Sequence, residues 1–311
     1  RDMGSVKVNK KTDTNGDGSF ETGNLGSNNL GFRWKLDGVN WEFGVQVDNL
    51  ATTTYSYSHS FGEAIPTGYH FVSWFNTNEI GRSCTNPNGT TLPDKIQVSK
   101  GQLTEITLCN ARDTGTIKII KNAVNDDIES FRFTTNIPGV VGGDFNLNDD
   151  GFGSNSRTFT IPVGSYWVQE DNEFGWKLTD ISCSESGSWS ATEGDRKVNI
   201  SLKADENVVC TFTNTELGSI SGYKFNDKNM DGDLDLSQGE GFLNGWRIFI
   251  DQNNNQTYDS GELYDTTSGW LIIPLGHYHI DNLLPGTYTI CEEMQSGWTN
   301  VTSKCVTETL S

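Results

Sequence analysis

Residues 115–121, Gly115-Thr116-Ile117-Lys118-Ile119-Ile120-Lys121, contain the pattern that decides the fold. Branched apolar residues alternate with polar ones, a period of two that is typical of a β-strand with one buried face. The pattern recurs as Gly4-Ser5-Val6-Lys7-Val8-Asn9-Lys10 and as Gly218-Ser219-Ile220-Ser221-Gly222-Tyr223-Lys224. The copies begin 111 and 103 residues apart, a spacing that suits one β-sandwich each. The sequence therefore predicts three units in tandem, with the bounds 1–113, 114–216 and 217–311.

The composition excludes several classes of function. The 311 residues include 22 Lys and Arg against 41 Asp and Glu, a net charge of −19. Nucleic acids and anionic membranes are bound through basic surfaces, so neither partner is expected. The longest apolar run, residues 270–275, is far shorter than the roughly 18 residues of a membrane-spanning helix, so we expect no membrane insertion in this segment. The chain begins at Arg1 without a signal peptide, and we expect a processed mature protein or a fragment.

Short alternating segments predict an all-β chain. Residues 131–134, 198–202 and 288–290 alternate apolar and polar residues between turns rich in Gly, Asn and Asp. Nine Trp argue against disorder, because a disordered chain lacks large groups to bury. The junctions 110–114 and 214–217 are too short to act as flexible linkers, so we expect a semi-rigid rod.

A second motif repeats inside the units and carries a family resemblance. Pro162-Val163-Gly164-Ser165-Tyr166-Trp167-Val168-Gln169-Glu170 recurs in residues 285–292 and, more weakly, in 66–72, and unit 2 ends in Phe212-Thr213-Asn214-Thr215. With the repeated first strand, these motifs resemble the Cna B-type, prealbumin-like β-sandwich domains of bacterial surface proteins. Unit 3 resembles the calcium-binding B repeats of serine-aspartate-repeat adhesins. The resemblance implies immunoglobulin-like or prealbumin-like sandwiches and a role in an extracellular stalk, pilus or adhesin.

Six cysteines are distributed two to a unit, and none has the Cys-x-x-Cys spacing of a zinc or redox site. An even split of this kind in a secreted chain predicts one structural disulfide in each domain. Six reduced thiols would instead indicate a cytosolic protein. Both Cys183 and Cys305 follow a Gly-Trp pair at the same distance, so Cys305 is interpreted as the counterpart of Cys183. The expected pairs are Cys84–Cys109, Cys183–Cys210 and Cys291–Cys305.

Three acidic loops have the alternating oxygen donors of a Ca²⁺ site. The alternative is a solvated turn, since Asp, Asn and Gly favour turns without a metal. In the second loop of unit 3 the candidate ligands are Asp251, Asn253, Asn255, Thr257, Asp259 and Glu262. In the first loop they are Asp227, Asn229, Asp231, Asp233, Asp235 and, because position 12 is Gln238, Glu240. In unit 1 they are Asp13, Asn15, Asp17 and Glu21.

The resemblance also implies a covalent crosslink, in which a first-strand Lys and a last-strand Asn condense beside a middle-strand Glu. In unit 2 the period of two turns Lys121, Glu170 and Asn214 toward the core, and burial would make the amine nucleophilic. The alternative is that the Lys reaches solvent and the Asn caps a turn. Unit 1 has Lys10 and Asn110 but carries Ser73 or Trp74 where the Glu is expected, so no bond is expected there.

Unit 3 lacks a closing strand. Units 1 and 2 end in two strands each, at 96–110 and 198–214, whereas unit 3 stops after 305–311. Either the natural chain is longer or another chain adds a strand to the open edge. Lys224 and Glu292 lie on core faces, so an incoming Asn could be captured covalently.

These observations predict a non-enzymatic structural protein, because no catalytic constellation is present. We expect an extracellular or cell-surface filament subunit whose partners are copies of itself or another surface protein. One alternative is an adhesin that grips a glycan; another is a non-catalytic accessory region of a secreted hydrolase. The candidate glycan contacts are Trp34, Trp41, Trp74 and Trp189. Sequons that permit N-glycosylation lie at Asn88, Asn199, Asn255 and Asn300.

Overall fold

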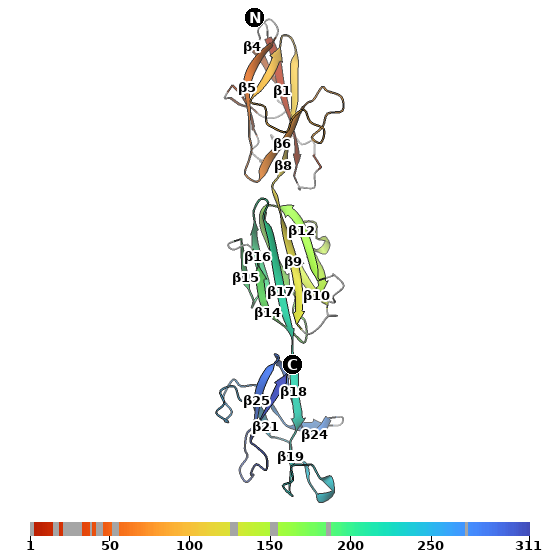
Figure 1. Ribbon diagram of the computed structural model, residues 1–311, viewed down its shortest axis with the longest axis vertical. Coiled ribbons are helices and arrows are strands. Elements are labelled where there is room, and N and C mark those ends of the chain that lie inside the picture. The colour runs from red at the N-terminus through yellow and green to blue at the C-terminus, as the bar shows by residue number, and fades with distance from the viewer. Residues whose placement is uncertain are drawn as a thin grey trace.

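A computed structural model describes residues 3–14, 19–20, 33–37, 39–41, 46–51, 56–124, 130–149, 155–184, 188–270 and 273–311. Three β-sandwich units follow one another along a single long axis (Figure 1). Because the strands alternate buried and exposed residues, each unit encloses its own apolar core. The chain is therefore all-β, as the sequence predicts.

Unit 2 is the most complete sandwich. One sheet has the strand order β12-β9-β17-β14 and the other has the order β11-β10-β13-β16-β15. The first strand, β9, runs parallel to the last strand, β17, and lies beside it. The elements are β9 (Thr114–Val124), β10 (Ser130–Thr135), η1 (Val141–Gly143), β11 (Asp144–Asn148), β12 (Ser156–Pro162), β13 (Gly164–Glu170), β14 (Trp176–Cys183), β15 (Trp189–Thr192), β16 (Lys197–Leu202) and β17 (Asn207–Glu216).

Unit 1 repeats this topology. Its sheets have the orders β4-β1-β8-β6 and β3-β2-β5-β7, and its first and last strands, β1 and β8, are again parallel neighbours. The strands are β1 (Met3–Asp13), β2 (Arg33–Leu36), β3 (Val39–Trp41), β4 (Gln46–Ala51), β5 (Ser56–Ala64), β6 (Tyr69–Asn76), β7 (Lys95–Ser99) and β8 (Leu103–Arg112).

The comparison of units 1 and 2 corrects one sequence assignment. The motif at residues 66–72 leads into β6, which pairs with the last strand β8 just as β14 pairs with β17. The strand equivalent to β13 is instead β5, because β5 pairs with β2 and β7 as β13 pairs with β10 and β16. The middle strand of unit 1 therefore ends at Ala64, before the Pro-x-Gly motif.

Unit 3 keeps only part of the sandwich. Its sheets have the orders β18-β24-β23, β19-β20 and β22-β21-β25-β26. Its elements are β18 (Gly218–Tyr223), β19 (Phe225–Asn226), η2 (Leu236–Gln238), β20 (Gly241–Phe242), β21 (Arg247–Ile250), β22 (Tyr264–Thr266), β23 (Ser268–Trp270), β24 (Ile273–Leu283), β25 (Gly286–Glu292) and β26 (Cys305–Leu310).

The register of β26 corrects the proposed equivalence of Cys305 and Cys183. Gly286 pairs with Leu310 in unit 3 as Gly164 pairs with Leu202 in unit 2, so β26 corresponds to β16. Cys183 lies instead in β14, whose counterpart in unit 3 would follow Trp298. That stretch forms turns and bends rather than a strand.

The junctions between units are single residues. Only Asp113 separates β8 from β9, and its backbone N–H donates to Gly68 O while its own carbonyl accepts from Val163 N. Only Leu217 separates β17 from β18, and its N–H donates to Gly175 O. Because hydrogen bonds to neighbouring loops fix both residues, the junctions have little freedom to bend. Within the described residues no helix is long and apolar enough to span a membrane.

Candidate crosslink and calcium sites

The core of unit 2 contains three polar residues, two on neighbouring strands of one sheet and one on the facing sheet. Lys121, Glu170 and Asn214 are all buried, on β9, β13 and β17 respectively. The parallel register pairs Lys121 with Phe212 and Ala123 with Asn214, so the Asn lies two residues further along the neighbouring strand, on the same face as the Lys. The structure therefore brings together the three residues that the period of two directs inward.

An ion pair joins two members of this group and leaves the third without a partner. Lys121 Nζ lies 3.3 Å from Glu170 Oε1 and 4.0 Å from the ring centre of Phe131. The other carboxylate oxygen of Glu170 accepts a hydrogen bond of 2.6 Å from Arg196. In the described part of the chain neither side-chain atom of Asn214 that can hydrogen-bond has a partner. A buried amide without a hydrogen-bond partner is destabilising by about 1–3 kcal/mol, so the unpaired side chain of Asn214 costs the fold stability.

Burial changes the chemistry of the amine. It lowers the pKa of Lys121 from 10.5 to about 8, against the opposing influence of the Glu170 carboxylate. About a tenth of such an amine is unprotonated at pH 7, and this form is a nucleophile. Glu170 lies close enough to move a proton to or from the amine. The arrangement suits attack of Lys121 on the amide of Asn214.

Unit 1 holds an equivalent group that includes a residue the sequence analysis missed. Lys10 on β1 contacts both Glu63 Oε1 on β5 and Asn110 Oδ1 on β8, and the side chains of all three are buried. The pairing of Lys10 with Leu108 and of Thr12 with Asn110 reproduces the register of unit 2. Burial lowers the pKa of Lys10 to about 8 and raises the pKa of Glu63. The expectation that unit 1 lacks the Glu is therefore wrong.

Two sequence signals identify Glu63. It follows Lys10 by 53 residues, close to the 49 residues between Lys121 and Glu170, and it shares the inward face of Phe61. The residues taken for the Glu position belong to β6 instead. Ser73 is buried there and donates a hydrogen bond to Cys84 O, and Trp74 packs against the core.

In unit 3 the corresponding Lys and Glu lie at the surface of the core. Lys224 Nζ is 2.8 Å from Glu292 Oε2 and 4.9 Å from the ring centre of Trp246. The second oxygen of Glu292 accepts a hydrogen bond from Asn300. The Lys224 side chain is 24% exposed, whereas those of Lys10 and Lys121 are fully buried. No described strand of this unit supplies an Asn in the register of units 1 and 2.

The loop 251–262 directs its oxygen atoms inward. Buried Asp251 accepts hydrogen bonds from the N–H groups of Asn255 and Gln256, and buried Glu262 accepts from those of Gln252 and Asp259. The side-chain amides of Asn253 and Asn255 both reach Asp259 Oδ2, at 2.8 and 2.7 Å. Thr257 places its N–H on Asn255 Oδ1, which leaves its carbonyl available as position 7 of the loop.

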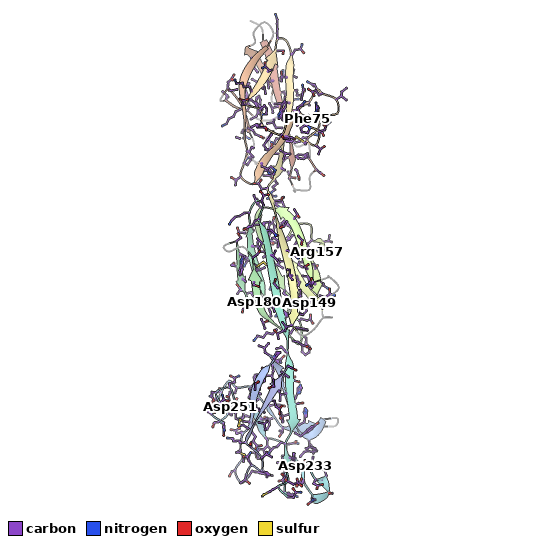
Figure 2. All side chains as sticks on the ribbon, in the orientation of Figure 1. Phe75, Asp149, Arg157, Asp180, Asp233 and Asp251 are labelled. Atoms are coloured by element: carbon purple, nitrogen blue, oxygen red, sulfur yellow. A yellow bond between two sulfur atoms is a disulfide. The ribbon has the colours of Figure 1, made fainter. Side chains whose placement is uncertain are left out.

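The loop 227–240 is held by its own acidic side chains in a similar way. Glu240 is buried and accepts hydrogen bonds from the N–H groups of Lys228, Asn229 and Asp235. Gln238 points instead to Asp235 Oδ2, at 3.0 Å. Asp227 accepts hydrogen bonds from the N–H groups of Met230 and Gly232. Further along the turn, Asp231 accepts hydrogen bonds from the side chain of Asn229 and from the N–H group of Asp233. Figure 2 labels Asp233 and Asp251 on these two separate loops of unit 3.

The third candidate loop is only partly described. Asp13 is buried at the end of β1, while Asn15, Asp17 and Glu21 lie outside the described residues.

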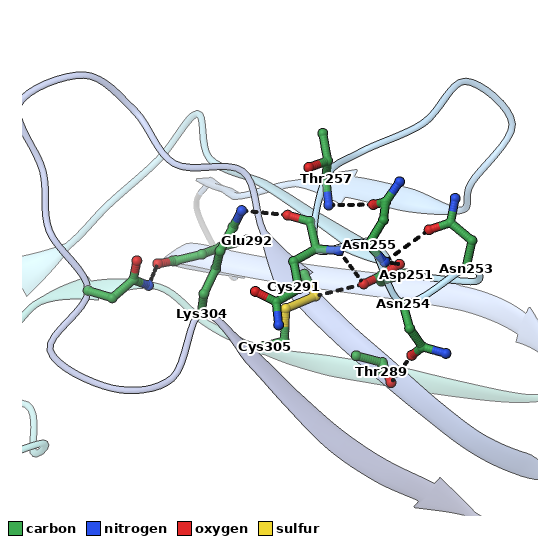
Figure 3. The surroundings of a disulfide bond; sticks show 12 residues. Asp251, Asn253, Asn254, Asn255, Thr257, Thr289, Cys291, Glu292, Lys304 and Cys305 are labelled. Carbon is green, nitrogen blue, oxygen red and sulfur yellow. Dashed lines mark hydrogen bonds between the residues drawn. A yellow bond between two sulfur atoms is a disulfide. The ribbon is translucent and has the colours of Figure 1, made fainter.

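The structure contains one disulfide in each unit, with the pairing expected from the sequence. The bonds Cys84–Cys109, Cys183–Cys210 and Cys291–Cys305 span 25, 27 and 14 residues. By the chain-entropy estimate each contributes about 3 kcal/mol to stability. Figure 3 places the carboxylate of Asp251 beside the third bond, with Cys291 Sγ 3.7 Å from Asp251 Oδ2. This disulfide therefore fastens β26 next to the loop 251–262.

The four tryptophans that the sequence suggests as glycan contacts pack in or against the apolar cores. Trp34 is fully buried against Trp41 and Phe61, so its expected exposure is wrong. Trp41 and Trp74 pack against the core of unit 1, and Trp189 packs against that of unit 2. Their partial exposure leaves little free aromatic surface for a sugar.

The comparison with solved structures matches proteins of several bacteria, among them a pilin and an adhesin. The Bacillus anthracis TIE protein is 16% identical, with a TM-score of 0.41; the match covers all of this chain and 49% of that one, so the chain spans about half its length. The major pilin from Streptococcus pyogenes is 15% identical over 68% of this chain and 98% of that one, with a TM-score of 0.30. An adhesin from Mobiluncus mulieris, described as containing intramolecular disulfide, isopeptide and ester crosslinks, is 14% identical over 56% of this chain and 67% of that one, with a TM-score of 0.29.

No curated protein sequence matches the chain. One family model does match, and it covers residues 117–216, which is almost the whole of unit 2. Its family is described as a prealbumin-like fold domain. The two sheets of unit 2, joined through the parallel pair β9 and β17, agree with that description. The middle unit of the chain is a prealbumin-like domain.

Proposed function

We propose that the chain is a non-catalytic subunit of an extracellular stalk, either of a pilus or of an adhesin. Lys–Asn isopeptide bonds fasten the first strand of units 1 and 2 to the last strand, and calcium orders the two acidic loops of unit 3. The observation that supports the bonds most directly is the repeated group of Lys10, Glu63 and Asn110 and of Lys121, Glu170 and Asn214. Three intra-unit disulfides support the extracellular location, because such bonds persist in oxidising compartments.

The chemistry of each bond needs no external reagent. The unprotonated Lys Nζ attacks the side-chain carbonyl carbon of the Asn, a C–N bond forms, and the amide nitrogen leaves as ammonia. The Glu accepts a proton from the attacking amine and delivers one to the leaving nitrogen. The burial that lowers the pKa of Lys10 and raises that of Glu63 favours the neutral pair that this step requires.

Intact mass spectrometry tests the proposal. Each bond removes one ammonia, about 17 Da, so the full chain should be about 34 Da lighter than its sequence mass after allowance for the disulfides. Glu63→Gln and Glu170→Gln should each restore about 17 Da. Glu105→Gln is the matched control, because Glu105 pairs with Lys7 on the same unit but at the surface. A wild-type chain of full mass would contradict the bonds.

The acidic residues at both ends of each loop support the proposal of calcium binding. Asp251 with Glu262 and Asp227 with Glu240 hold their carboxylates against backbone N–H groups of their own loops. Such oxygen-rich loops suit Ca²⁺, which takes six to eight oxygen ligands. Assembly by strand addition at unit 3 is the third part of the proposal.

A further inference from the structure

The outer face of the sheet β18-β24-β23 in unit 3 carries two histidines on one strand. His277 and His279 lie on β24 two residues apart, so their side chains share a face. Tyr278 and Ile280, which alternate with them, pack in or against the core, and this places both imidazoles on the outside of the sandwich. The two rings are nearly parallel, at 18°, with their centres 6.2 Å apart. The strand therefore presents two imidazoles side by side at the surface.

A carboxylate on the same strand face determines the protonation of one ring. His279 Nε2 lies 2.6 Å from Asp281 Oδ1. An ionised carboxylate has lone pairs but no proton, so at this distance Nε2 carries the proton, and in the neutral imidazole Nδ1 keeps its lone pair. In metal sites the nitrogen of a histidine that does not bind the metal is commonly placed against a carboxylate, which fixes the tautomer and the orientation of the ring. The pair of His279 and Asp281 has this arrangement.

The second histidine is held by packing rather than by hydrogen bonds. The ring of His277 contacts that of Tyr223, which lies opposite it on β18, edge to face at 5.2 Å. Among the described residues, neither ring nitrogen of His277 has a hydrogen-bond partner, and neither has Nδ1 of His279. The His279 side chain is 43% exposed, so an ion can reach it from solvent. These nitrogens are therefore available as ligands.

The surroundings of the pair favour a cation. Asp265 Oδ2, on β22, accepts a hydrogen bond of 2.8 Å from the backbone N–H of His279, so a second carboxylate lies beside the same strand. The whole chain carries a net charge of −19. Both features lower the energy of a positive ion near the two rings.

The type of donor atom selects the class of ion. Imidazole nitrogen suits Zn²⁺, Cu²⁺ and Ni²⁺, whereas Ca²⁺ takes oxygen ligands. One Zn²⁺ ion can bind both rings at metal–nitrogen distances of about 2.0–2.1 Å after a small rotation of the side chains. The histidine pair therefore differs in its chemistry from the two acidic loops of unit 3, whose candidate ligands are oxygen atoms.

We propose that His277 and His279 bind one divalent transition-metal ion at the surface of unit 3, and that Asp281 is the positioning residue for His279. Nitrogen atoms of the two rings supply the protein ligands, and water completes the coordination of the ion. The site uses neither the crosslinks proposed for units 1 and 2 nor the two calcium loops, so it stands or falls independently of them.

Metal titration of the full chain, without an affinity tag and in buffer that contains Ca²⁺, tests the site. The chain has four histidines, so the NMR spectrum of isotope-labelled histidine rings is simple enough to assign with single His→Asn variants. Zn²⁺ should shift the ring signals of His277 and His279 and leave those of the other two histidines in place. Calorimetry should show saturable binding of one ion per chain, with Cu²⁺ bound more tightly than Zn²⁺.

Variants distinguish the pair from a single surface histidine. His277→Asn and His279→Asn should each weaken Zn²⁺ binding at least tenfold. Asp281→Asn should weaken it by about 10–100-fold and should also alter the ring nitrogen shifts of His279 that report its tautomer, while the melting temperature stays the same. His70→Asn is the matched control, because His70 also lies beside a carboxylate, with its Nδ1 2.8 Å from Asp113 Oδ1, but has no second histidine two residues away.

Three results would contradict parts or all of this proposal. Absence of saturable binding at millimolar Zn²⁺ would overturn the site. Zn²⁺-induced shifts that spare His277 and His279, or calorimetric Zn²⁺ binding of unchanged affinity in the double variant His277→Asn and His279→Asn, would assign the ion to another part of the chain and overturn it as well. Unchanged affinity in Asp281→Asn would overturn the positioning role of Asp281.

Discussion

Units 2 and 3 begin with the same strand pattern, but the lysines at the ends of those strands have different surroundings. Lys121 is enclosed by Glu170, Phe131 and the last strand, while Lys224 retains its Glu and an aromatic neighbour but is partly exposed to solvent. The unit 2 core contains twenty buried apolar residues and the main unit 3 core contains five. The difference teaches that the closing strand, rather than the Lys–Glu pair, buries the site.

Unit 3 has two acidic loops, 227–240 and 251–262, and each is held by a buried Glu that accepts hydrogen bonds from backbone N–H groups. The contact of Asp251 with Cys291 ties the second loop to β25, and a hydrogen bond from Lys304 to Gln256 O ties it to the residue that precedes β26. Unit 3 therefore combines a smaller apolar core with two loops rich in acidic residues.

Removing the crosslink from unit 2 should make its Lys–Glu pair resemble that of unit 3. Asn214→Ala keeps Lys121 and Glu170 but cannot form the bond, which closes a segment of about 90 residues. Loss of a crosslink of that span should lower the free energy of unfolding of unit 2 by about 4–5 kcal/mol. Calorimetry or urea denaturation measures the change. Thr211→Ala, on the outward face of the same strand, should have little effect; equal stability of Asn214→Ala and wild type would contradict the bond.

Removing calcium should increase the difference in stability between unit 3 and the other two units. A ligand that binds only the folded state at about 100 times its dissociation constant stabilises it by about 3 kcal/mol, so chelation should destabilise unit 3 by that amount and leave units 1 and 2 unchanged. Glu262→Gln should abolish most of the effect of the second loop, and Glu240→Gln most of that of the first. Gln238→Ala is the control, because Gln238 contacts Asp235 rather than the loop interior. A melting profile insensitive to chelation would remove calcium from unit 3.

The smallest expected effect is a pH dependence that appears only when the bond is absent. In Asn214→Ala the Lys121 amine has a folded pKa of about 8 against 10.5 when unfolded, so the folded state binds fewer protons between these values. The free energy of unfolding should therefore rise with pH across that window, by about 1 kcal/mol per unit. Wild-type unit 2, whose amine is consumed by the bond, should lack this slope.

Denaturation at pH 8.5, 9.0 and 9.5, within that window, measures the slope. The double variant Asn214→Ala and Lys121→Met removes the amine and serves as the control for other titrating groups. A slope in wild type equal to that of Asn214→Ala would show that the amine is still free.

Local periodicity predicted much of the fold and of the unit 2 site. The alternation in residues 115–121, 164–170 and 208–214 directed Lys121, Glu170 and Asn214 inward, because side chains on a strand alternate between its two faces. The even distribution of cysteines led to the three disulfide pairs. These inferences depend only on neighbouring residues or on counts within a unit.

The missed features depend on strand pairing, which is non-local. The Pro-x-Gly turn precedes β6 in unit 1 but β13 in unit 2. Aligning the units on this turn assigned the Glu position to β6, so Glu63 on β5 was not recognised. Cys305 was matched to Cys183 by its distance from Gly-Trp, although its strand pairs as β16 does. Spacing alone cannot choose between such alternatives.

The parallel first and last strands have a consequence for the chain under tension. Tension along the rod would enter unit 2 at Thr114 and leave at Glu216, the two outer ends of β9 and β17. With the proposed Lys121–Asn214 bond in place, the covalent path runs along β9 to Lys121, crosses the bond and exits two residues later. The residues between Lys121 and Asn214 then carry no load, so tension cannot unfold unit 2 into an extended chain. With the proposed Lys10–Asn110 bond, unit 1 would have the same path.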